Sequence, residues 1–362
     1  MFNVIDLFSG CGGLSYGMKM AGYNVLLGVD NDKAALETFS YNHTESIAKY
    51  ADITEVSKQD IEQIVGENID VIVGGPPCQG MSLSGPRKFE DPRNKLYLSF
   101  IEKITEFMPK AFIIENVPGI LGLYKGQIKD SIVSKLTEIG YNITFELVDS
   151  SDFGIPQTRK RVFFIGVRND LNQKYKFPAP TTLFETDKIT ALQATSDLPL
   201  LHNDLGKEVQ NYSVSPENEY QCQMRLKSNN IYNHIGTNHT EQTKKIISLV
   251  PEGGNYKDLP EKYRKVRKFN VAWTRYHSDK PTPTIDTGHR HHFHYKENRV
   301  PTVRENARFQ SFPDNFIFKG NKTQQYRQVG NAVPPLLAKQ ISLKLLEILK
   351  KEVDLIDLPS TR

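Results

Sequence analysis

The chain has 362 residues and a net charge of +4, with 38% apolar and 24% charged residues. This composition is ordinary for a globular protein large enough for two domains. No apolar run approaches the roughly 20 residues of a membrane-spanning helix, and the N-terminus lacks a signal-peptide pattern, so a cytoplasmic location is expected. The three cysteines, Cys11, Cys78 and Cys222, are too few and too far apart for a disulfide framework or a zinc motif. A functional cysteine is therefore expected to be a nucleophile.

Residues 1–168 alternate between strand-like and helix-like patterns in chain order. Such alternation predicts βαβ units and therefore an α/β domain with a doubly wound, Rossmann-like, mostly parallel sheet. Ligands of such sheets bind beyond the carboxyl ends of the strands. Strand-like runs lie at 3–8, 24–29, 70–74, 111–115, 141–148 and 161–167, and helical candidates lie near 33–42, 57–66, 94–107 and 126–139.

The first strand runs directly into a glycine-rich turn, because residues 6–13 read DLFSGCGG. Glycines permit positive φ angles and let a ligand approach the backbone closely. Asp30 ends the second strand, where an acid can bind both hydroxyls of a ribose. Asp52 follows a third possible strand end, where a carboxylate can accept a hydrogen bond from an adenine amino group. The two acids predict an adenosine-containing cofactor, but they do not distinguish a nicotinamide cofactor from S-adenosylmethionine.

The fourth strand ends in GGPPCQG at residues 74–80. Two prolines fix the backbone just before Cys78 and flanking glycines leave it open, which favours a reactive thiol over an inert buried one. Glu115 ends the next strand, on the same ligand-binding edge. Arg159 and Arg161 open the strand at 161–167, and alternation predicts that they share one face, where two guanidinium groups can hold a base carbonyl and a phosphate. A plain basic strand edge is the alternative interpretation.

These groups fit one reaction on cytosine. Attack of a thiolate on carbon 6 makes carbon 5 nucleophilic. A carboxyl group that contacts N3 and the exocyclic amine helps the ring accept the electron density. Carbon 5 then takes the methyl group of a sulfonium, and loss of the C5 proton and the thiol restores the aromatic ring. The base must be flipped out of the duplex for this chemistry, and residues 79–93 are hypothesised to form a mobile loop that closes over the DNA.

The pattern changes after residue 170, because residues 170–298 are polar and show no clear period. This indicates a second, smaller domain with irregular or mixed structure. Near the C-terminus, Pro334 and Pro335 precede an amphipathic helix of about 17 residues that is expected to pack back onto the first domain. The predicted divisions are a catalytic domain at 1–170, a target-recognition domain at 171–300, a hinge or bracing segment at 301–325, and a return to the catalytic domain at 326–362.

Residues 256–275 contain seven Lys or Arg against two acids, with aromatic residues between them. Such a local basic surface suits a phosphate backbone, although a solvated basic helix or loop would look the same. Four histidines follow, and they could bind a metal or contact DNA. No step of the reaction requires a metal, so none is expected. These histidines are residues 289, 291, 292 and 294.

The order of motifs resembles that of the bacterial DNA (cytosine-5) methyltransferases, the modification enzymes of restriction systems. The resemblance implies S-adenosylmethionine as cofactor and double-stranded DNA as substrate. It also implies protection of host DNA from a cognate restriction endonuclease that acts on the same site without a stable complex, and a monomer is expected. The matching segments are DLFSGCGG, Asp30, Asp52, GGPPCQG, DPRNKL, ENV, QTRKRVFFIG, TVRENARFQSFPDNF at 302–316 and QVGNAVPP at 328–335.

The resemblance also implies roles for individual residues. Cys78 would be the nucleophile, with Glu115, Arg159 and Arg161 holding the cytosine. The 302–316 element would brace the variable region, with Arg304 and Arg308 in structural roles. Cys11 and Asn31 depart from the residues common in the family at their positions, and Cys11 is interpreted as part of the cofactor pocket. The implied cofactor residues are Phe8, Gly10, Cys11, Gly12, Gly13, Asp30, Asn31, Asp52, Ile53, Pro77, Leu96 and Asn331, and the candidate DNA contacts are Ser82, Arg87, Trp273, Arg275, Thr284 and Arg290.

Two other functions remain open from the sequence. The eukaryotic relatives that methylate tRNA share much of the catalytic core, although the 170–298 insertion looks more like a DNA target-recognition region than their shorter one. A DNA-binding protein without catalysis is the second alternative. The joint presence of the cysteine, the glutamate and the arginine pair argues against it.

Overall fold

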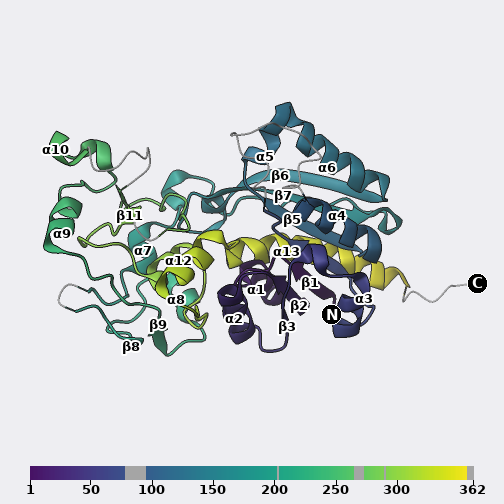
Figure 1. Ribbon diagram of the computed structural model, residues 1–362, viewed down its shortest axis with the longest axis horizontal. Coiled ribbons are helices and arrows are strands. Elements are labelled where there is room, and N and C mark those ends of the chain that lie inside the picture. Colours follow the sequence, from purple (N-terminus) through teal and green to yellow (C-terminus); the bar gives the residue numbers. More distant parts are fainter. Residues whose placement is uncertain (78–94, 202–203, 265–272, 289–290, 357–362) are drawn as a thin grey trace, which may run out of the picture. The chain divides into compact units, whose positions relative to one another are not determined.

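The chain folds into two compact units (Figure 1). The compact units differ from the predicted divisions at 170 and 326, because unit 1 extends to residue 179, lacks the short segment 150–159, and resumes only at residue 337. The computed structural model describes residues 1–77, 95–201, 204–264, 273–288 and 291–356. Unit 1 comprises 1–149, 160–179 and 337–362, and unit 2 comprises 150–159 and 180–336.

Unit 1 is built on a seven-stranded sheet with the strand order β3-β2-β1-β4-β5-β7-β6. The first five strands pair in parallel, whereas β7 is antiparallel to both β5 and β6. This confirms the predicted α/β class and the mostly parallel sheet. The strands are β1 (Asn3–Leu7), β2 (Asn24–Asp30), β3 (Ile47–Tyr50), β4 (Val71–Gly74), β5 (Ala111–Asn116), β6 (Tyr141–Asp149) and β7 (Lys160–Arg168).

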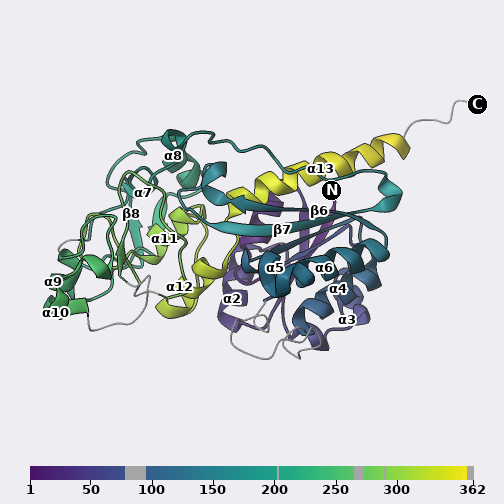
Figure 2. The same cartoon turned by 90° about the horizontal axis from the view of Figure 1, so that it is seen from above.

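Helices cover both faces of this sheet, and the strands lie between α13 on one side and α3, α4 and α6 on the other (Figure 2). The predicted strands and helices of 1–168 are confirmed to within one residue at each end. Their apolar residues fill a core that includes Ile5, Ile72, Phe100 and Phe112. The helices are α1 (Gly13–Met20), α2 (Lys33–Asn42), α3 (Lys58–Val65), α4 (Lys95–Phe107), α5 (Gly119–Gly122), α6 (Gln127–Glu138) and α13 (Pro335–Ile356).

The C-terminal helix α13 returns to unit 1, as predicted, but it has 22 residues and is longer than expected. Its buried side chains include Ile341 and Leu345. Two tyrosine hydroxyls donate to its backbone, from Tyr23 to Ser342 O at 3.1 Å and from Tyr175 to Ile341 O at 3.0 Å. Within the described residues, no helix is both long enough and apolar enough to cross a membrane.

Unit 2 consists of short elements joined by long irregular segments. Among its described residues no strand exceeds three residues and no helix exceeds ten. Short elements leave many backbone groups without a regular partner, and polar side chains must satisfy them. For example, Asn233 Nδ2 donates to Phe318 O, and Asn233 Oδ1 accepts from Phe318 N, both at 2.9 Å. The elements are β8 (Val209–Asn211), β9 (Asn230–Tyr232), β10 (Thr274–Arg275), β11 (His292–Phe293), α7 (Ala191–Thr195), α8 (Glu219–Arg225), α9 (Glu241–Ser248), α10 (Glu261–Arg264), α11 (Val303–Phe309) and α12 (Lys322–Asn331).

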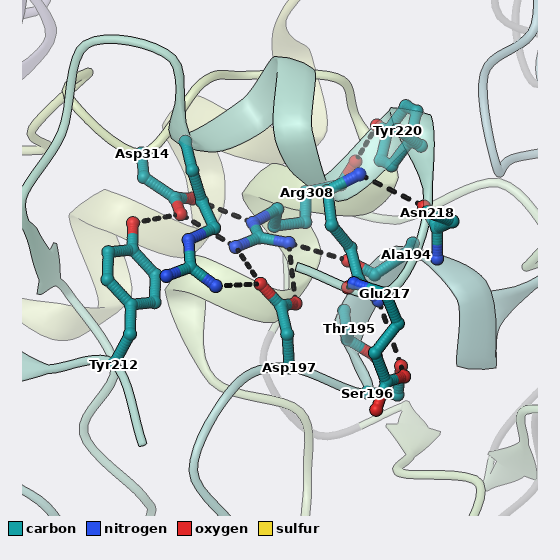
Figure 3. Close-up of polar contacts among 12 residues, drawn as sticks. Ala194, Thr195, Ser196, Asp197, Tyr212, Glu217, Asn218, Tyr220, Arg308 and Asp314 are labelled. Carbon is teal, nitrogen blue, oxygen red and sulfur yellow. Dashed lines mark hydrogen bonds and ion pairs between the residues drawn. The ribbon is translucent and has the colours of Figure 1, made fainter. Parts of the chain in front are cut away.

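Helix α11 carries the two arginines for which structural roles are predicted, and both are fully buried. The Arg308 guanidinium bonds Asp197 at 2.9 Å and Asp314 at 2.7 Å, and Figure 3 shows it between these two carboxylates. Tyr212 donates to the same Asp314 at 2.5 Å. The structural role is confirmed. Arg304 likewise donates to the backbone oxygens of Tyr232, Pro313 and Phe316.

Candidate active site

Residues from six strands of unit 1 meet at one edge of the sheet, which we call the carboxyl edge. Because β1 to β5 are parallel, the residues that follow them lie at this edge. Because β7 is antiparallel to β5, its first residues lie at the same edge. The strand order reverses between β1 and β4, and such switch points are where doubly wound sheets bind their ligands.

The glycine turn follows β1 and has an unusual backbone. Phe8, Gly10 and Gly12 have φ angles of +70°, +53° and +92°. A side chain at Gly12 would collide with His43 and Phe39, so this glycine is required by close packing as well as by φ. At Gly10, by contrast, a Cβ would meet nothing within 4 Å. The turn is therefore closely packed at Gly12 and has open space at Gly10.

Asp30 ties the end of β2 to this turn. Its carboxylate accepts hydrogen bonds from Gly10 N at 2.7 Å and Asp32 N at 2.9 Å. Burial raises its pKa, and the two backbone N–H groups partly offset this. Each carboxylate oxygen has a second acceptor site, which leaves capacity for a ligand hydroxyl. Asn31, at the next position, is exposed.

Asp52 follows β3 and caps a short 3-10 helix, η1 (Ile53–Glu55). Its Oδ1 accepts from Thr54 N at 2.9 Å and from Thr54 Oγ1 at 2.8 Å. Local capping therefore uses one of the two carboxylate oxygens, and the predicted adenine contact would need the other. Ile53 is buried beneath it, in the core.

Asp6 is a buried polar residue of this region that sequence reasoning missed. Its Oδ2 accepts from Ser15 Oγ at 2.6 Å, but its Oδ1 has no hydrogen-bond partner among the described residues, and neither has the buried Oγ of Ser9. Burial raises the pKa of Asp6 to about 7. The sequence feature that could have identified Asp6 is an acid within a buried, mostly apolar strand that leads into a glycine turn. Unsatisfied buried polar atoms at this place fit a polar ligand.

Cys78 lies outside the described residues, whereas the backbone that leads to it is described up to Pro77. Asn116 Nδ2 donates to Pro76 O at 3.1 Å. A Cβ at Gly75 would lie 3.0 Å from Glu115 Oε2, so the glutamate carboxylate packs directly against this backbone. The end of β5 and the loop after β4 are thus in contact at the carboxyl edge.

Glu115 and Arg161 form an ion pair at this edge, with Oε1 and Nε 2.9 Å apart. Their side chains are 12% and 14% exposed, so both are largely shielded from water but still accessible. Arg161 also donates to Lys160 O at 2.8 Å. The antiparallel direction of β7 brings this arginine beside the glutamate, because Glu115 pairs with Phe163 and Asn116 with Val162.

Arg159 and Arg161 have different partners. Arg159 precedes β7 and belongs to unit 2, where its side chain is buried with 1% exposure. Its guanidinium donates to Gly330 O at 2.9 Å and to Ile285 O at 3.5 Å. Arg159 lies one residue before β7 (Lys160–Arg168), and its contacts are inside unit 2, whereas Arg161 pairs with Glu115.

The other predicted cofactor residues are dispersed. Leu96 lies in α4 and packs against the core together with Phe8. Cys11 is buried, and burial raises the pKa of its thiol to about 12, which disfavours a thiolate. Asn331 is the exposed last residue of α12 in unit 2. Gly13 begins α1 and is buried.

Two of the predicted DNA contacts are interior residues. Trp273 packs in a core of unit 2 with Phe293 and Val300. The buried Arg275 donates to Ile247 O at 2.7 Å and to Asn298 Oδ1 at 2.8 Å. Both side chains are buried inside unit 2, which does not fit their predicted role as DNA contacts. Thr284 is exposed, and the remaining candidates, Ser82, Arg87 and Arg290, lie outside the described residues.

A cluster with metal-like geometry does exist in unit 2, at His294, Glu297 and Glu305. Arg299 lies among these side chains and bonds Glu297 at 2.5 Å and Glu305 at 2.6 Å. Burial by itself would raise the pKa of Glu305, but Arg299 and His294 outweigh burial and hold that pKa below its ordinary value. The guanidinium already supplies the positive charge that two buried carboxylates need.

The fold and the carboxyl edge define a doubly wound α/β enzyme with a glycine turn and acids at successive strand ends, as in proteins that bind adenosine cofactors. The family model for the C-5 cytosine-specific DNA methylases matches residues 2–347. The chain therefore belongs to this family, and it is a DNA cytosine-5 methyltransferase.

Individual relatives agree with this assignment. The chain is 39% identical to the type II methyltransferase M.DdeI of Desulfomicrobium norvegicum, over 95% of this chain and 88% of that protein. It is 36% identical to M1.HphI of Haemophilus parahaemolyticus, over 95% and 86% of the two chains. A crystal structure described as a prophage-encoded DNA modification methyltransferase of E. coli superposes with a TM-score of 0.81 at 29% identity, covering 97% of this chain and all of that one. The S. pombe Dnmt2 methyltransferase, at 16% identity and a TM-score of 0.58, shares the fold.

Proposed function

We propose that the protein transfers a methyl group from S-adenosylmethionine to carbon 5 of a specific cytosine that it flips out of duplex DNA, with Cys78 as nucleophile. The observation that carries this proposal is the Glu115–Arg161 pair, packed against the backbone at Gly75 that leads to Cys78. A carboxylate and a guanidinium side by side match the polar edge of cytosine, which offers an amine, a ring nitrogen and a carbonyl oxygen.

Each group has one task in this proposal. The Cys78 thiolate forms a bond to carbon 6, and the displaced ring electrons make carbon 5 nucleophilic. Glu115 holds N3 and the exocyclic amine and stabilises the electron-rich ring, while Arg161 donates to the base carbonyl and orients Glu115. After methylation, loss of the C5 proton and release of the thiol restore the aromatic base. Arg159 takes no part in contacting the base.

S-adenosylmethionine supplies a methyl group on a sulfonium when it is bound. Asp30 would hold the ribose hydroxyls and Asp52 the adenine amine, with the glycine turn at 8–13 beneath the cofactor. Asn31, Ile53, Pro77, Leu96 and Asn331 stay in the proposed cofactor set. The open space at Gly10 and the unsatisfied oxygens of Asp6 and Ser9 support a polar ligand at this turn.

Unit 2 would read the DNA sequence. Thr284, which is exposed, is proposed to contact DNA. Ser82, Arg87 and Arg290 remain proposed contacts. The hypothesis that residues 79–93 close over the flipped base concerns a segment outside the described residues. We further propose that the enzyme acts as a monomer in the cytoplasm. There it would protect host DNA from a cognate endonuclease that recognises the same site without forming a stable complex.

The test is covalent trapping on DNA that carries 5-fluorocytosine, because fluorine replaces the C5 proton whose loss releases the thiol, and the adduct therefore persists. We expect an adduct with wild-type protein that survives denaturing electrophoresis, and none with Cys78→Ser. The matched control is Cys222→Ser, which changes an exposed cysteine of unit 2 and should leave the adduct unchanged. An adduct in Cys78→Ser, or none in the wild type, would overturn the proposal.

Two further measurements define the substrate. Parallel assays with duplex DNA and with tRNA separate the proposed enzyme from an RNA methyltransferase, since only the DNA should be labelled. Bisulfite sequencing of DNA from cells that express the protein then reports the modified cytosine and its surrounding sequence. Transfer to tRNA alone would refute the DNA substrate.

A further inference from the structure

Inside unit 2, backbone hydrogen bonds link residues 156–159, which precede β7, to residues 282–285 of the predicted target-recognition domain. Thr158 N donates to Thr282 O at 2.8 Å. Thr282 N and Oγ1 both donate to Pro156 O, at 2.9 and 3.1 Å. Segments 126 residues apart in the chain therefore pair like two short strands. We call this pairing the recognition joint.

The side chain of Gln157 fastens the recognition joint from within. It is fully buried, and its Oε1 accepts from Ile285 N at 3.1 Å. Its Nε2 donates to Phe309 O at 3.3 Å and to Gln310 Oε1. Gln310 in turn donates to two carbonyl oxygens of the 329–332 segment. An amide offers donors and an acceptor in this shape, so a glutamate here would place the oxygen that replaces Nε2 against two acceptors, Phe309 O and Gln310 Oε1.

Arg159 fastens the recognition joint from the other side. Its guanidinium donates to Ile285 O and Gly330 O, and so connects the recognition region to the end of α12. The two backbones are so close that a Cβ on Gly330 would collide with Asp286 O. Arg159 and Gln157 thus bond the carbonyl and the amide of the same residue, Ile285.

The recognition joint ends at Arg159, and β7 begins at the next residue, Lys160. We propose that Gln157 and Arg159 are positioning residues that fix the 282–285 segment to residues 156–159 within unit 2, and that this fixed geometry sets the DNA sequence that unit 2 selects. This inference rests on the proposed role of unit 2. Displacement of the joint would loosen the choice of DNA sequence before it affects the chemistry.

The decisive variant is Gln157→Glu. A buried hydrogen bond is worth about tenfold in an equilibrium constant, so we expect the KM for plasmid DNA to rise about tenfold or more. We also expect the share of methylation outside the preferred sequence, measured by bisulfite sequencing of the same plasmid, to rise by a similar factor. The kcat at saturating DNA should change much less. A merely structural defect would lower kcat through loss of folded enzyme and would leave KM and sequence choice unaltered.

The matched control is Gln193→Glu, also in unit 2. Gln193 Oε1 accepts from Thr190 N in a helix capping box, a task that glutamate performs equally well. Its KM and sequence choice should equal those of the wild type. If Gln157→Glu does not fold, as judged by its melting temperature, Thr282→Val takes its place, because it removes only the buried hydroxyl bond to Pro156 O. About a threefold rise in KM is then expected.

The outcomes separate this inference from the proposed function. If wild-type protein methylates no DNA, the proposed function fails. If the wild type methylates DNA and the folded variant matches it in both KM and sequence choice, the proposed function stands and the recognition joint has no positioning role.

Discussion

Carboxylates and guanidinium groups occur in both units, but their surroundings differ. At the carboxyl edge of unit 1, Glu115 and Arg161 pair with each other, and each keeps about an eighth of its side chain accessible. Inside unit 2, Arg308 lies between Asp197 and Asp314, and all three side chains are fully buried. The first pair can exchange a partner for a substrate, whereas the second network cannot be opened without exposing a buried charge.

The difference follows from how each unit satisfies its backbone. Unit 1 has long strands and helices whose backbone groups bond one another, so its polar side chains at the strand ends make few bonds to distant backbone and keep part of their bonding capacity for a ligand, as Asp30 does. Unit 2 has short elements, and its buried polar side chains are used as internal caps, as Arg304 shows by donating to three carbonyl oxygens. The same residue types therefore serve chemistry in one unit and architecture in the other.

Removing a buried arginine should have the largest effect. We expect Arg308→Ala to destabilise the protein by about 3–5 kcal/mol, because it leaves Asp197 and Asp314 buried without their cation. Differential scanning calorimetry, with limited proteolysis of unit 2, measures this. The control Lys344→Ala removes an exposed ion pair with Glu347 and should cost less than about 1 kcal/mol. Equal effects of the two substitutions would contradict the contrast between the units.

Among the described residues of unit 1, Asp6 is a buried acid, and its Oδ1 has no hydrogen-bond partner there. Its pKa of about 7 in the folded protein exceeds its ordinary value of 3.8, so the native state binds the extra proton between these values. The stability from this proton is present below about pH 4 and is lost as the pH rises through about 7, amounting to about 4 kcal/mol at most. Asp6→Asn is neutral at every pH and should lack this slope.

Urea unfolding at about pH 5 and about pH 8 checks the slope. Asp130→Asn, at an exposed position, should keep the wild-type dependence. The test is the difference between the two proteins, because buried histidines such as His43 contribute an opposite slope to both. A wild-type free energy of unfolding that does not fall relative to that of Asp6→Asn between these pH values would show that Asp6 does not titrate there.

Glu115→Gln should change catalysis and leave stability alone. We expect turnover to fall about 10²-fold, equivalent to about 2.7 kcal/mol in the barrier, because the amide cannot share a proton with N3. The DNA affinity and the melting temperature should stay close to those of the wild type. Methyl transfer from labelled cofactor measures turnover, with the exposed Glu347→Gln as control. Turnover within a factor of about three of wild type would remove Glu115 from the chemistry.

The smallest effect is expected at an exposed helix cap. Ser57 caps α3 and shares a capping box with Asp60. Ser57→Ala should cost about 1 kcal/mol of unfolding free energy and leave turnover unchanged. A Ser57→Thr variant, which keeps the hydroxyl, should recover most of this loss. A cost above that of Arg308→Ala would reverse the expected ranking.

The sequence by itself determined the elements of unit 1 and the acids at their ends. Local periodicity fixes strands and helices, and parallel order then forces residues such as Asp30 and Glu115 to one edge, whatever the details of packing. The glycine motif likewise marks its own turn, because a positive φ at Gly12 needs that residue type.

The tertiary structure alone decided which polar residues are available to a ligand. Arg159 and Arg161 look equivalent in the sequence, but one bonds carbonyl oxygens of residues 285 and 330 while the other pairs with Glu115. Trp273 looked like a DNA contact and is a core residue. These contacts join residues far apart in the chain, and the burial that sets their energy depends on all the surrounding segments at once. The periodicity of nearby residues in the sequence therefore does not predict this burial.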